Sequence, residues 1–307
     1  MTKVFIDGSA GTTGLRIADR LADRKDITLV KLPEEFRKDP SARKDAICGA
    51  DIAFLCLPDD AAREAVALAG ESDAKIIDTS TAHRTNDAWA YGFPELQGCR
   101  EKIVKSKRIA NPGCHASGFV ALVAPLVENG IIPKEKALTC FSLTGYSGGG
   151  KKMIAQYEGD DRGILLDAPR QYALTQQHKH LKEMAKLSHL DKLPAFCPIV
   201  ADFYSGMEVT VPLFAEDLQG SIEDIRKIYA EYYATGLVRY SDSPDADGML
   251  SAVAFSGRDD MQVGVYGNEE RILLVSRFDN LGKGASGAAI QNMNIVMGLP
   301  EETGLNV

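Results

Sequence analysis

The first 24 residues most strongly limit the folds open to this 307-residue chain. Residues 3–7 form a short, mostly apolar run that is typical of a buried strand, and residues 15–24 carry apolar side chains at helical spacing. The seven residues between them are Gly8, Ser9, Ala10, Gly11, Thr12, Thr13 and Gly14. The three glycines permit a tight turn and let backbone N–H groups at a helix N-terminus approach a pyrophosphate. An ordinary glycine-rich turn is the alternative, but the flanking strand and helix favour a dinucleotide-binding loop.

Strands and helices continue to alternate after this unit. Apolar runs at 27–32, 52–57 and 75–78 predict strands, and residues 61–70 predict a helix. The near-continuous apolar run at 52–57 is typical of a strand buried on both faces. This alternation predicts a Rossmann-type, doubly wound parallel sheet.

The composition changes near residue 114, where we place a domain boundary. An apolar helix is expected over 116–129, and strand-rich segments follow at 138–144, 207–214, 263–266 and 271–278. Residues 284–298 return to a helical pattern rich in small residues. The later part of the chain therefore predicts a second, α+β domain.

Charge and cysteine content exclude several classes of protein. The net charge is −8 without any basic stripe, so nucleic acid is not the expected partner. No apolar run approaches the roughly 20 residues of a membrane span, and a strand that begins within three residues leaves no room for a signal peptide. The six cysteines form no C-x-x-C pair, which argues against a zinc ribbon or a redox dithiol. We expect free thiols, a cytoplasmic location and no metal.

Cys114 is the candidate nucleophile, although most cysteines are inert core residues. It follows Asn111-Pro112-Gly113 and precedes the apolar helix, where the helix dipole and free N–H groups lower a thiol pKa. His178 and His180 lie two positions apart, so in an extended segment both would point the same way. They could instead be a polar helix start, and a metal site is disfavoured because no third ligand has suitable spacing. A thiol, an imidazole and a dinucleotide together predict attack on an activated acyl group and reduction of the thioester by hydride.

The other histidines are expected to be structural or exposed, with His115 the next candidate for the base if the His178 and His180 pair is structural. His83 and His115 are predicted to be structural, and His189 is predicted to lie at the surface.

The residues after the second predicted strand bear on the choice of dinucleotide. NAD binders place an acidic residue there, whereas NADP binders supply cations for the 2′-phosphate. Glu34 and Glu35 precede Arg37 and Lys38, so the signal is mixed. The hydroxyls of the glycine loop and the nearby Arg37 favour NADP, with a solvated loop as the alternative for Arg37.

Several polar residues are candidates for holding the substrate. Arg84 follows the fourth predicted strand and could bind a phosphate or carboxylate, unless it forms a surface ion pair. Asn111 precedes the candidate nucleophile. Ser147, Gly148 and Gly149 could present backbone N–H groups to an acyl oxygen or an anion.

Six motifs occur in the order of a known family. They are Gly8-x-x-Gly11-x-x-Gly14, Ser80-Thr81-Ala82-His83-Arg84, Tyr91-Gly92-Phe93-Pro94-Glu95-Leu96, Asn111-Pro112-Gly113-Cys114, His178-Lys179-His180 and Asp279-Asn280-Leu281-Gly282-Lys283-Gly284-Ala285. Over nearly the whole chain they resemble the N-acetyl-γ-glutamyl-phosphate reductases, in particular their shorter class. The wider superfamily includes aspartate-semialdehyde dehydrogenase.

The resemblance implies an architecture and an activity. Residues 1–113 plus 281–307 would form the NADP-binding Rossmann domain, and residues 114–280 the catalytic and dimerisation domain of a homodimer or homotetramer. The activity would be NADPH-dependent reduction of a small acyl phosphate in arginine biosynthesis. The alternatives are aspartate-semialdehyde dehydrogenase and, in another class, a non-catalytic NADP-sensing regulator, which the intact cysteine and histidine pair disfavour.

The resemblance also implies roles for individual residues. Cys114 would be the nucleophile, His180 the acid/base, His178 the residue that orients the substrate, and Asn280 would lie near the nicotinamide. In the longer class the residue after the cysteine is usually Tyr, whereas this chain has His115. Finer substrate contacts therefore do not transfer from the longer class.

Overall fold

The chain separates into two compact units. The computed structural model describes residues 1–307, with the side chain of Ala246 left out. The first unit comprises Met1–Pro112 and Ala285–Leu305, and the second comprises Gly113–Gly284 with Asn306–Val307. The C-terminal part of the chain therefore returns to the unit that the N-terminal part begins.

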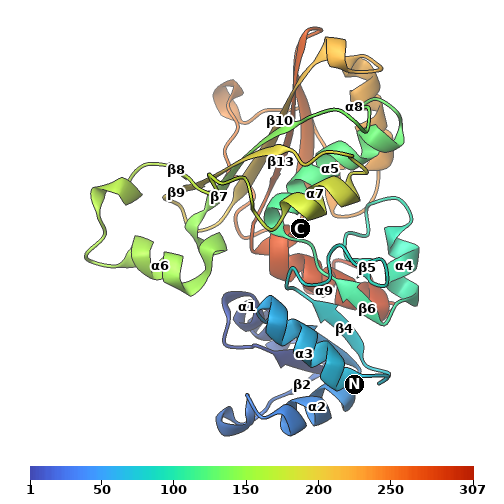
Figure 1. Ribbon diagram of the computed structural model, residues 1–307, viewed down its shortest axis with the longest axis vertical. Helices are drawn as coiled ribbons and strands as arrows, with labels where there is room; N and C mark the ends of the chain where they lie inside the picture. The colour runs from blue at the N-terminus through green and yellow to red at the C-terminus, as the bar shows by residue number, and fades with distance from the viewer. The chain divides into compact units, whose positions relative to one another are not determined.

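A six-stranded sheet forms the centre of the first unit (Figure 1). Its strands are β1 (Thr2–Asp7), β2 (Ile27–Val30), β3 (Ile52–Leu55), β4 (Lys75–Asp78), β5 (Ala90–Tyr91) and β6 (Arg108–Ala110). They lie in the order β2-β1-β3-β4-β6-β5, and every pairing is parallel. The helices are α1 (Thr12–Ala22), α2 (Pro40–Cys48), α3 (Asp59–Ala69), α4 (Cys99–Lys105) and α9 (Gly287–Val296), with a 3-10 turn at Glu34–Phe36.

Two hydrophobic cores cover the two faces of this sheet. One contains Ile17 of α1, Ile103 of α4 and Met293 of α9, and the other contains Ile47 of α2 and residues of α3. All four residues of β3 are buried, as its continuous apolar run predicts. The doubly wound parallel sheet is therefore confirmed. Its strand order reverses between β1 and β3, and ligands of such sheets bind where the carboxyl ends of the strands meet this reversal.

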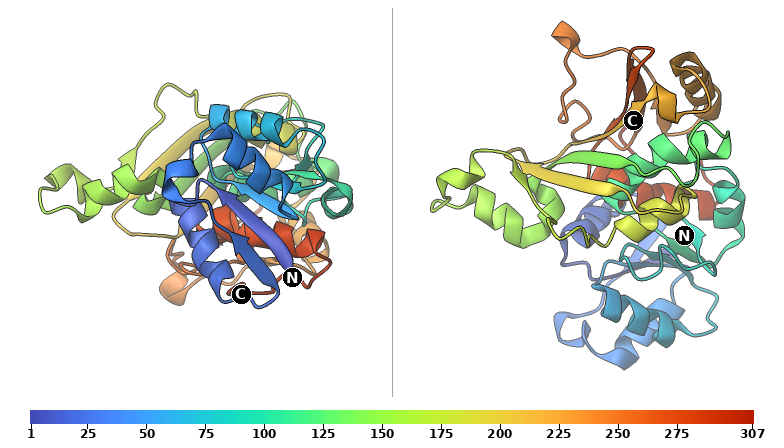
Figure 2. Two further views of the ribbon diagram at one scale, coloured as in Figure 1. Left: turned by 90° about the horizontal axis from the view of Figure 1, so that it is seen from below. Right: turned by 45° about the horizontal axis from the view of Figure 1, so that its top comes forward.

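The second unit is built on a mixed seven-stranded sheet, and it confirms the predicted second α+β fold. Its strands are β7 (Thr139–Gly145), β8 (Arg170–Gln171), β9 (Ala195–Ala201), β10 (Met207–Phe214), β11 (Val238–Tyr240), β12 (Met261–Gly267) and β13 (Arg271–Phe278), in the order β11-β12-β13-β10-β7-β9-β8. The α-helices are α5 (Cys114–Glu128), α6 (Gly150–Glu158), α7 (Leu181–Leu187) and α8 (Ile222–Tyr232). Short 3-10 turns lie at Tyr146–Gly149, Ile164–Leu166, Ala215–Asp217 and Ala246–Gly248, and a π-helix lies at Gly282–Ser286. The segment that contains α6 extends from the end of β7, away from α5 (Figures 1 and 2).

Helix α5 is the central helix of this unit. Every residue from His115 to Val127 is buried, as expected for a helix that is apolar on all sides. It packs against β10 and β13, with Gly118 at the closest point. A Cβ at Gly118 would lie 2.5 Å from Val209 and 2.7 Å from Ser276, so a larger side chain would push the helix off the sheet. This packing fixes the position of the helix N-terminus at Cys114.

Some element boundaries differ from the sequence predictions for local reasons. Helix α1 begins at Thr12 rather than near residue 15, because Gly11 already takes the N-cap position. Strand β9, which contains Pro198, and helix α8 were not predicted. Helix α7 follows His180, where a polar helix start was the alternative interpretation of the histidine pair. Strands β10 and β13 have the predicted bounds. Within the described residues, no helix is long and apolar enough to span a bilayer.

Candidate active site

Cys114 is the first residue of α5, and its side chain is partly exposed. Gly113 occupies the N-cap position without a side-chain hydrogen bond to the helix, and the first turn contains no acidic residue. The positive end of the helix dipole therefore acts on the thiol, which favours the thiolate. The predicted position of Cys114 at a helix N-terminus is confirmed.

Glycine 284 allows the chain to pass close to this cysteine. A Cβ on Gly284 would lie 3.0 Å from the Cβ of Cys114 and 3.1 Å from the carbonyl oxygen of Asp279. The buried Asp279 carboxylate accepts hydrogen bonds from the N–H groups of Leu281, at 2.7 Å, and Gly257. The Asp-Asn-Leu-Gly-Lys-Gly run is thus a turn whose shape places a bare backbone against the candidate nucleophile.

His178 and His180 lie in a turn, not in an extended segment. His180 has helical backbone angles (φ −78°, ψ −13°) as the N-cap of α7, so the extended segment considered for the two histidines is not formed at His180. Their ring centroids are 4.7 Å apart and the rings are perpendicular. The His180 backbone N–H donates to Nδ1 of His178 at 3.2 Å, so the proton of a neutral His178 is on Nε2.

His115 joins this pair to make a cluster of three imidazoles. Its ring centroid lies 5.6 Å from that of His178 and 5.6 Å from that of His180. Its Nδ1 is 2.7 Å from the Ser142 hydroxyl and its Nε2 is 2.6 Å from the Tyr172 hydroxyl. Burial, assisted by the charge of His178, lowers the pKa of His115 to about 3, so this ring is neutral.

Sequence reasoning missed two polar residues of this site. Tyr172 gave no periodic or motif signal because it lies in a loop after β8. Glu183 is buried on α7, and its carboxylate accepts a hydrogen bond of 2.8 Å from the Gly113 N–H. Its position three residues after His180 was the available signal, because residues three apart share a helix face.

Two further predicted residues meet in the same unit. The Asn280 amide donates to the Ser147 hydroxyl at 3.0 Å, and its carbonyl accepts from the Gly206 N–H at 3.0 Å. The prediction that Ser147 presents its backbone N–H to a ligand is wrong, because that N–H donates to the Tyr204 carbonyl at 3.0 Å. Gly148 and Gly149 follow in the same 3-10 turn and are exposed.

The glycine loop of the first unit has the geometry of a diphosphate cradle. Gly8 has φ +85°, and a Cβ there would lie 2.3 Å from the Cys56 carbonyl oxygen. A Cβ on Gly14 would lie 2.5 Å from the Gly8 carbonyl oxygen. Gly11 caps α1 without a side-chain hydrogen bond, so the N–H groups of the first turn can bind an anion. The loop therefore fits a dinucleotide.

Two arginines, Arg37 and Arg43, follow the glycine loop in the sequence. Arg37 lies after the 3-10 turn that follows β2, exposed, with Nη1 3.7 Å from the Glu34 carboxylate. Asp7 ends β1 in a buried ion pair of 3.0 Å with Arg43 of α2. Burial raises the pKa of Asp7 although the Arg43 guanidinium acts in the opposite direction. Of the two arginines, Arg37 is thus exposed, whereas the Arg43 side chain is buried in an ion pair with Asp7.

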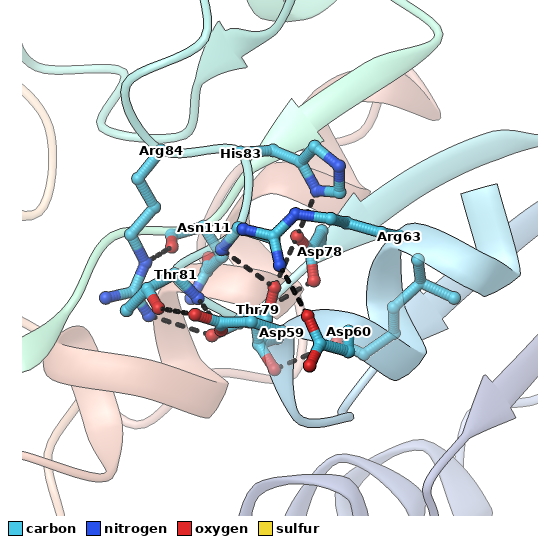
Figure 3. Close-up of polar contacts among 12 residues, drawn as sticks. Asp59, Asp60, Arg63, Asp78, Thr79, Thr81, His83, Arg84 and Asn111 are labelled. Carbon is cyan, nitrogen blue, oxygen red and sulfur yellow. Dashed lines mark hydrogen bonds and ion pairs between the residues drawn. The ribbon is translucent and has the colours of Figure 1, made fainter. Parts of the chain in front are cut away.

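Arg84 and Asn111 contact each other in the first unit (Figure 3). The surface ion pair considered for Arg84 is wrong, because its buried guanidinium donates to the carbonyls of Asn111 at 2.9 Å and Thr79 at 2.8 Å. The Asn111 amide donates to the Ala285 carbonyl at 3.0 Å. This contact ties the segment before the candidate nucleophile to the start of the C-terminal helix segment.

Neighbouring polar groups complete this region. His83 is buried, with Nδ1 2.6 Å from the Asp78 carboxylate, and its ring stacks on Trp89 at 4.1 Å.

His189 is exposed, as predicted. In the part of the chain that the structure describes, no group of three or more His, Cys, Asp or Glu side chains could hold a metal ion.

Comparison with known proteins identifies the class first. Residues 25–106 match the family model for the NAD-binding domain of semialdehyde dehydrogenases, and residues 114–280 match that for their dimerisation domain. Aspartate semialdehyde dehydrogenase II of Vibrio cholerae, solved in complex with ASA, has a TM-score of 0.72 at 16% identity, over 97% of this chain and 98% of that chain. The Candida albicans enzyme solved with NADP has a TM-score of 0.66 at 17% identity, over 97% and 98%. The two family models place the chain in the semialdehyde dehydrogenase superfamily, and the fold agrees with this.

Curated relatives then give the family. N-acetyl-gamma-glutamyl-phosphate reductase 2 of Nostoc sp. is 47% identical over 99% of both chains. The reductase of Brucella ovis is 44% identical, over 96% of this chain and 99% of its own. This chain belongs to the N-acetyl-gamma-glutamyl-phosphate reductase family, as its motifs indicated. Aspartate-semialdehyde dehydrogenase is not favoured, because the solved structures with that name share only the fold.

Proposed function

We propose that this protein reduces N-acetyl-γ-glutamyl phosphate to N-acetylglutamate 5-semialdehyde with NADPH, in arginine biosynthesis. The observation that carries the proposal is Cys114 at the start of α5, in the same unit as a cluster of three imidazoles. The family membership supplies the substrate class.

Cys114 performs the covalent step in this proposal. Its Sγ attacks the acyl carbon, the carbon–oxygen bond to phosphate breaks, and a thioester and inorganic phosphate result. NADPH, when bound, supplies the hydride that reduces this carbon. The resulting Cys114 thiohemiacetal loses its hydroxyl proton as the carbon–sulfur bond breaks, which releases the aldehyde and restores the thiol. N–H groups at the start of α5 stabilise the negative oxygen.

His178 and His180 have different roles in this proposal. We assign His180 as the acid/base that moves protons at the thiol and the reacting oxygen, as the resemblance to the family implies. His178 orients the substrate, and its Nε2–H is the donor, since Nδ1 is occupied by the His180 N–H.

NADP is the proposed cofactor, bound by Gly8 to Gly14 with Arg37 at the 2′-phosphate. Arg37 is exposed and its contact with Glu34 is long, so it can turn to a phosphate at little cost. Arg37→Ala should raise the KM for NADP and leave the KM for NAD unchanged. Equal effects on both cofactors would remove Arg37 from this role. Asn280 is assigned to the nicotinamide end.

The substrate itself is assigned to Arg84, Asn111 and the Ser147-Gly148-Gly149 turn. The Ser147 hydroxyl and the N–H groups of the two exposed glycines are the donors in that turn, because the Ser147 N–H is already bonded. Arg84 acts through the Asn111 carbonyl that it holds, in addition to any direct contact with the anion. We assign residues 1–113 plus 281–307 to the cofactor and residues 114–280 to catalysis and subunit contacts.

A second copy of the chain is the proposed protein partner, in a homodimer or homotetramer. One face of the second sheet packs against α5 and α8, whereas the opposite face carries large apolar side chains. These are Phe141, Phe214 and Leu273, which are 44%, 58% and 42% exposed. Their strands are adjacent, so they form one apolar surface of the kind that a partner covers. All six cysteines are free thiols, which supports the cytoplasm as the compartment.

The test is a panel of semialdehydes oxidised in the reverse direction. The protein is assayed with NADP and inorganic phosphate against N-acetylglutamate semialdehyde and aspartate semialdehyde. We expect phosphate-dependent reduction of NADP with the first. Turnover of aspartate semialdehyde alone would indicate the alternative enzyme, and NADP binding without turnover of either would indicate a sensor.

The variant Cys114→Ser tests the nucleophile in the same assay. It should bind NADP normally and lose nearly all turnover, because a serine hydroxyl is a poor nucleophile at neutral pH. Cys48→Ser, which changes an exposed thiol at the end of α2, is the matched control and should keep parental rates. Turnover of Cys114→Ser within about 10-fold of the parent, a barrier difference of only ~1.4 kcal/mol, would exclude covalent catalysis by Cys114.

A further inference from the structure

The residue after the candidate nucleophile belongs to a hydrogen-bonded chain that the proposed mechanism leaves unused. His115 of α5 lies between the hydroxyls of Ser142 on β7 and Tyr172 in the loop after β8, at 2.7 and 2.6 Å. A neutral imidazole has one N–H and one lone pair, so one of these hydroxyls donates to the ring and the other accepts from it.

Burial decides the direction of this chain. Ser142 is fully buried, and in the described part of the chain its hydroxyl has His115 as its hydrogen-bond partner. A buried hydroxyl hydrogen without an acceptor is costly, so Ser142 donates to Nδ1 of His115. The imidazole proton is then on Nε2 and is donated to the oxygen of Tyr172. Because the Tyr172 oxygen accepts from His115, the hydrogen of the Tyr172 hydroxyl can be donated to a different acceptor.

Tyr172 is well placed to use that hydrogen. It is partly exposed, and a hydrogen bond of 3.0 Å from its backbone N–H to the Pro198 carbonyl holds it against β9. Its ring lies 6.1 Å from that of His178. Burial, and next the charge of Cys114, raises the pKa of Tyr172, so the hydroxyl keeps its proton. Its hydrogen bond to His115 holds it beside the residue that follows the nucleophile in the chain.

We propose that Tyr172 is a further catalytic residue, which donates a hydrogen bond to the acyl oxygen of the substrate held at Cys114, and that His115 is its positioning residue. This inference rests on the proposed function for the identity of the substrate. It gives His115 a positioning role, whereas the sequence analysis predicted that this histidine is structural. It also gives the site a neutral donor in addition to the two histidines.

The groups that face His115 do not support the opposite direction of these hydrogen bonds. They are Cys114 on its own helix, Ser142 on β7, Phe196 on β9, Tyr172 in the loop after β8, and His178 and His180 before α7. None of them is a carboxylate that would hold a proton on Nδ1. The imidazole therefore stays neutral, with its proton directed at Tyr172.

Kinetics of matched variants test the donor. Tyr172→Phe should lower kcat by about 100-fold, the effect of removing one donor to a developing oxyanion, and leave the NADP dissociation constant unchanged. Tyr232→Phe removes a hydroxyl that bonds Glu128 on α5, and it should keep parental kinetics. A kcat for Tyr172→Phe within threefold of the parent would overturn the proposal.

Variants of His115 test the positioning role. His115→Gln keeps a donor near the place of Nε2 and should retain most of kcat, whereas His115→Leu should match Tyr172→Phe. The double variant His115→Leu/Tyr172→Phe should be no slower than either single variant, because both remove the same hydrogen bond. Additive losses would overturn the link between the two residues.

A spectroscopic readout is independent of the reaction. In ¹H–¹⁵N spectra of histidine-labelled protein, His115 should show a single neutral form, protonated on Nε2, from pH 5 to pH 8. A form protonated on Nδ1, or a charged form in this range, would overturn the proposal. If the parental protein does not act on the acyl phosphate but shows this form, then the proposed function fails and the hydrogen-bonded chain stands. If it acts and Tyr172→Phe acts equally well, then the role of Tyr172 fails alone.

Discussion

Replacement of Gly284 by alanine should damage the site by pressing on the nucleophile. The added Cβ would lie 3.0 Å from the Cβ of Cys114, 3.1 Å from the carbonyl oxygen of Asp279 and 3.2 Å from the ring of Phe278. The Asp279 carbonyl already accepts from the Gly284 N–H at 3.0 Å, and Phe278 is fully buried. Two of the three neighbours are therefore fixed, and Cys114 must move by a few tenths of an ångström.

The magnitude follows from two opposing terms. Overpacking of a well-filled site costs about 1–3 kcal/mol, and alanine regains up to about 1 kcal/mol over glycine inside a helical segment. We expect the free energy of unfolding in urea to fall by about 1–2 kcal/mol, the balance of these terms. Because a displacement of about 1 Å can cost roughly 100-fold, a shift of a few tenths should lower kcat by about 3- to 10-fold.

The control for Gly284→Ala is Gly163→Ala. Gly163 has φ −79° and ψ 153°, which alanine adopts freely, and nothing lies within 4 Å of an added Cβ. Urea unfolding, kcat and the rate of carboxymethylation of Cys114 are measured for both variants. If Gly284→Ala matched the control in stability and in the rate of carboxymethylation, the argument from close packing would be refuted.

Three further results are expected. His180→Asn should lower kcat strongly and flatten one limb of the pH–rate profile, whereas His178→Asn should mainly raise the KM for the acyl phosphate; the reverse pattern would exchange their roles. Arg43→Met leaves the buried Asp7 without its partner and should cost about 3–5 kcal/mol near pH 7. Burial already raises the pKa of Asp7, so this variant should regain stability from pH 7.5 to pH 5 as the carboxyl takes a proton, and urea midpoints that do not rise would contradict this. Leu273→Glu should shift the sedimentation of the protein toward the monomer, and an unchanged sedimentation coefficient would remove its sheet face from the interface.

Regular patterns in the sequence were sufficient to predict the sheets. Strand β10 alternates buried and less buried side chains, most of β13 is buried, and β3 is apolar throughout, so the apolar runs predicted these strands closely. The position of Cys114 was predictable because Pro112 and Gly113 precede a long apolar helix.

Contacts between distant residues were not predictable in the same way. The hydrogen bond between His115 and Tyr172 joins residues 57 positions apart, and Tyr172 lies in a loop without periodicity. The sequence also could not show that the buried Arg84 would bond to backbone carbonyls, because these appear only when β4 and β6 lie side by side. The turn at His180 depends on where α7 begins, and short helices of this kind give little signal.

The return of α9 to the first sheet has a consequence for synthesis of the protein. Ala289, Ile290 and Met293 of this helix complete the core that Val4 and Ile17 begin, yet they are translated only after residues 113–284. Until they emerge from the ribosome, one face of the N-terminal sheet lacks its final helix. The contiguous segment 113–284 can reach its own fold earlier, although it follows the first strands in the chain. A nascent chain that ends before α9 therefore leaves this apolar face uncovered, and uncovered apolar surface of this kind is prone to aggregate.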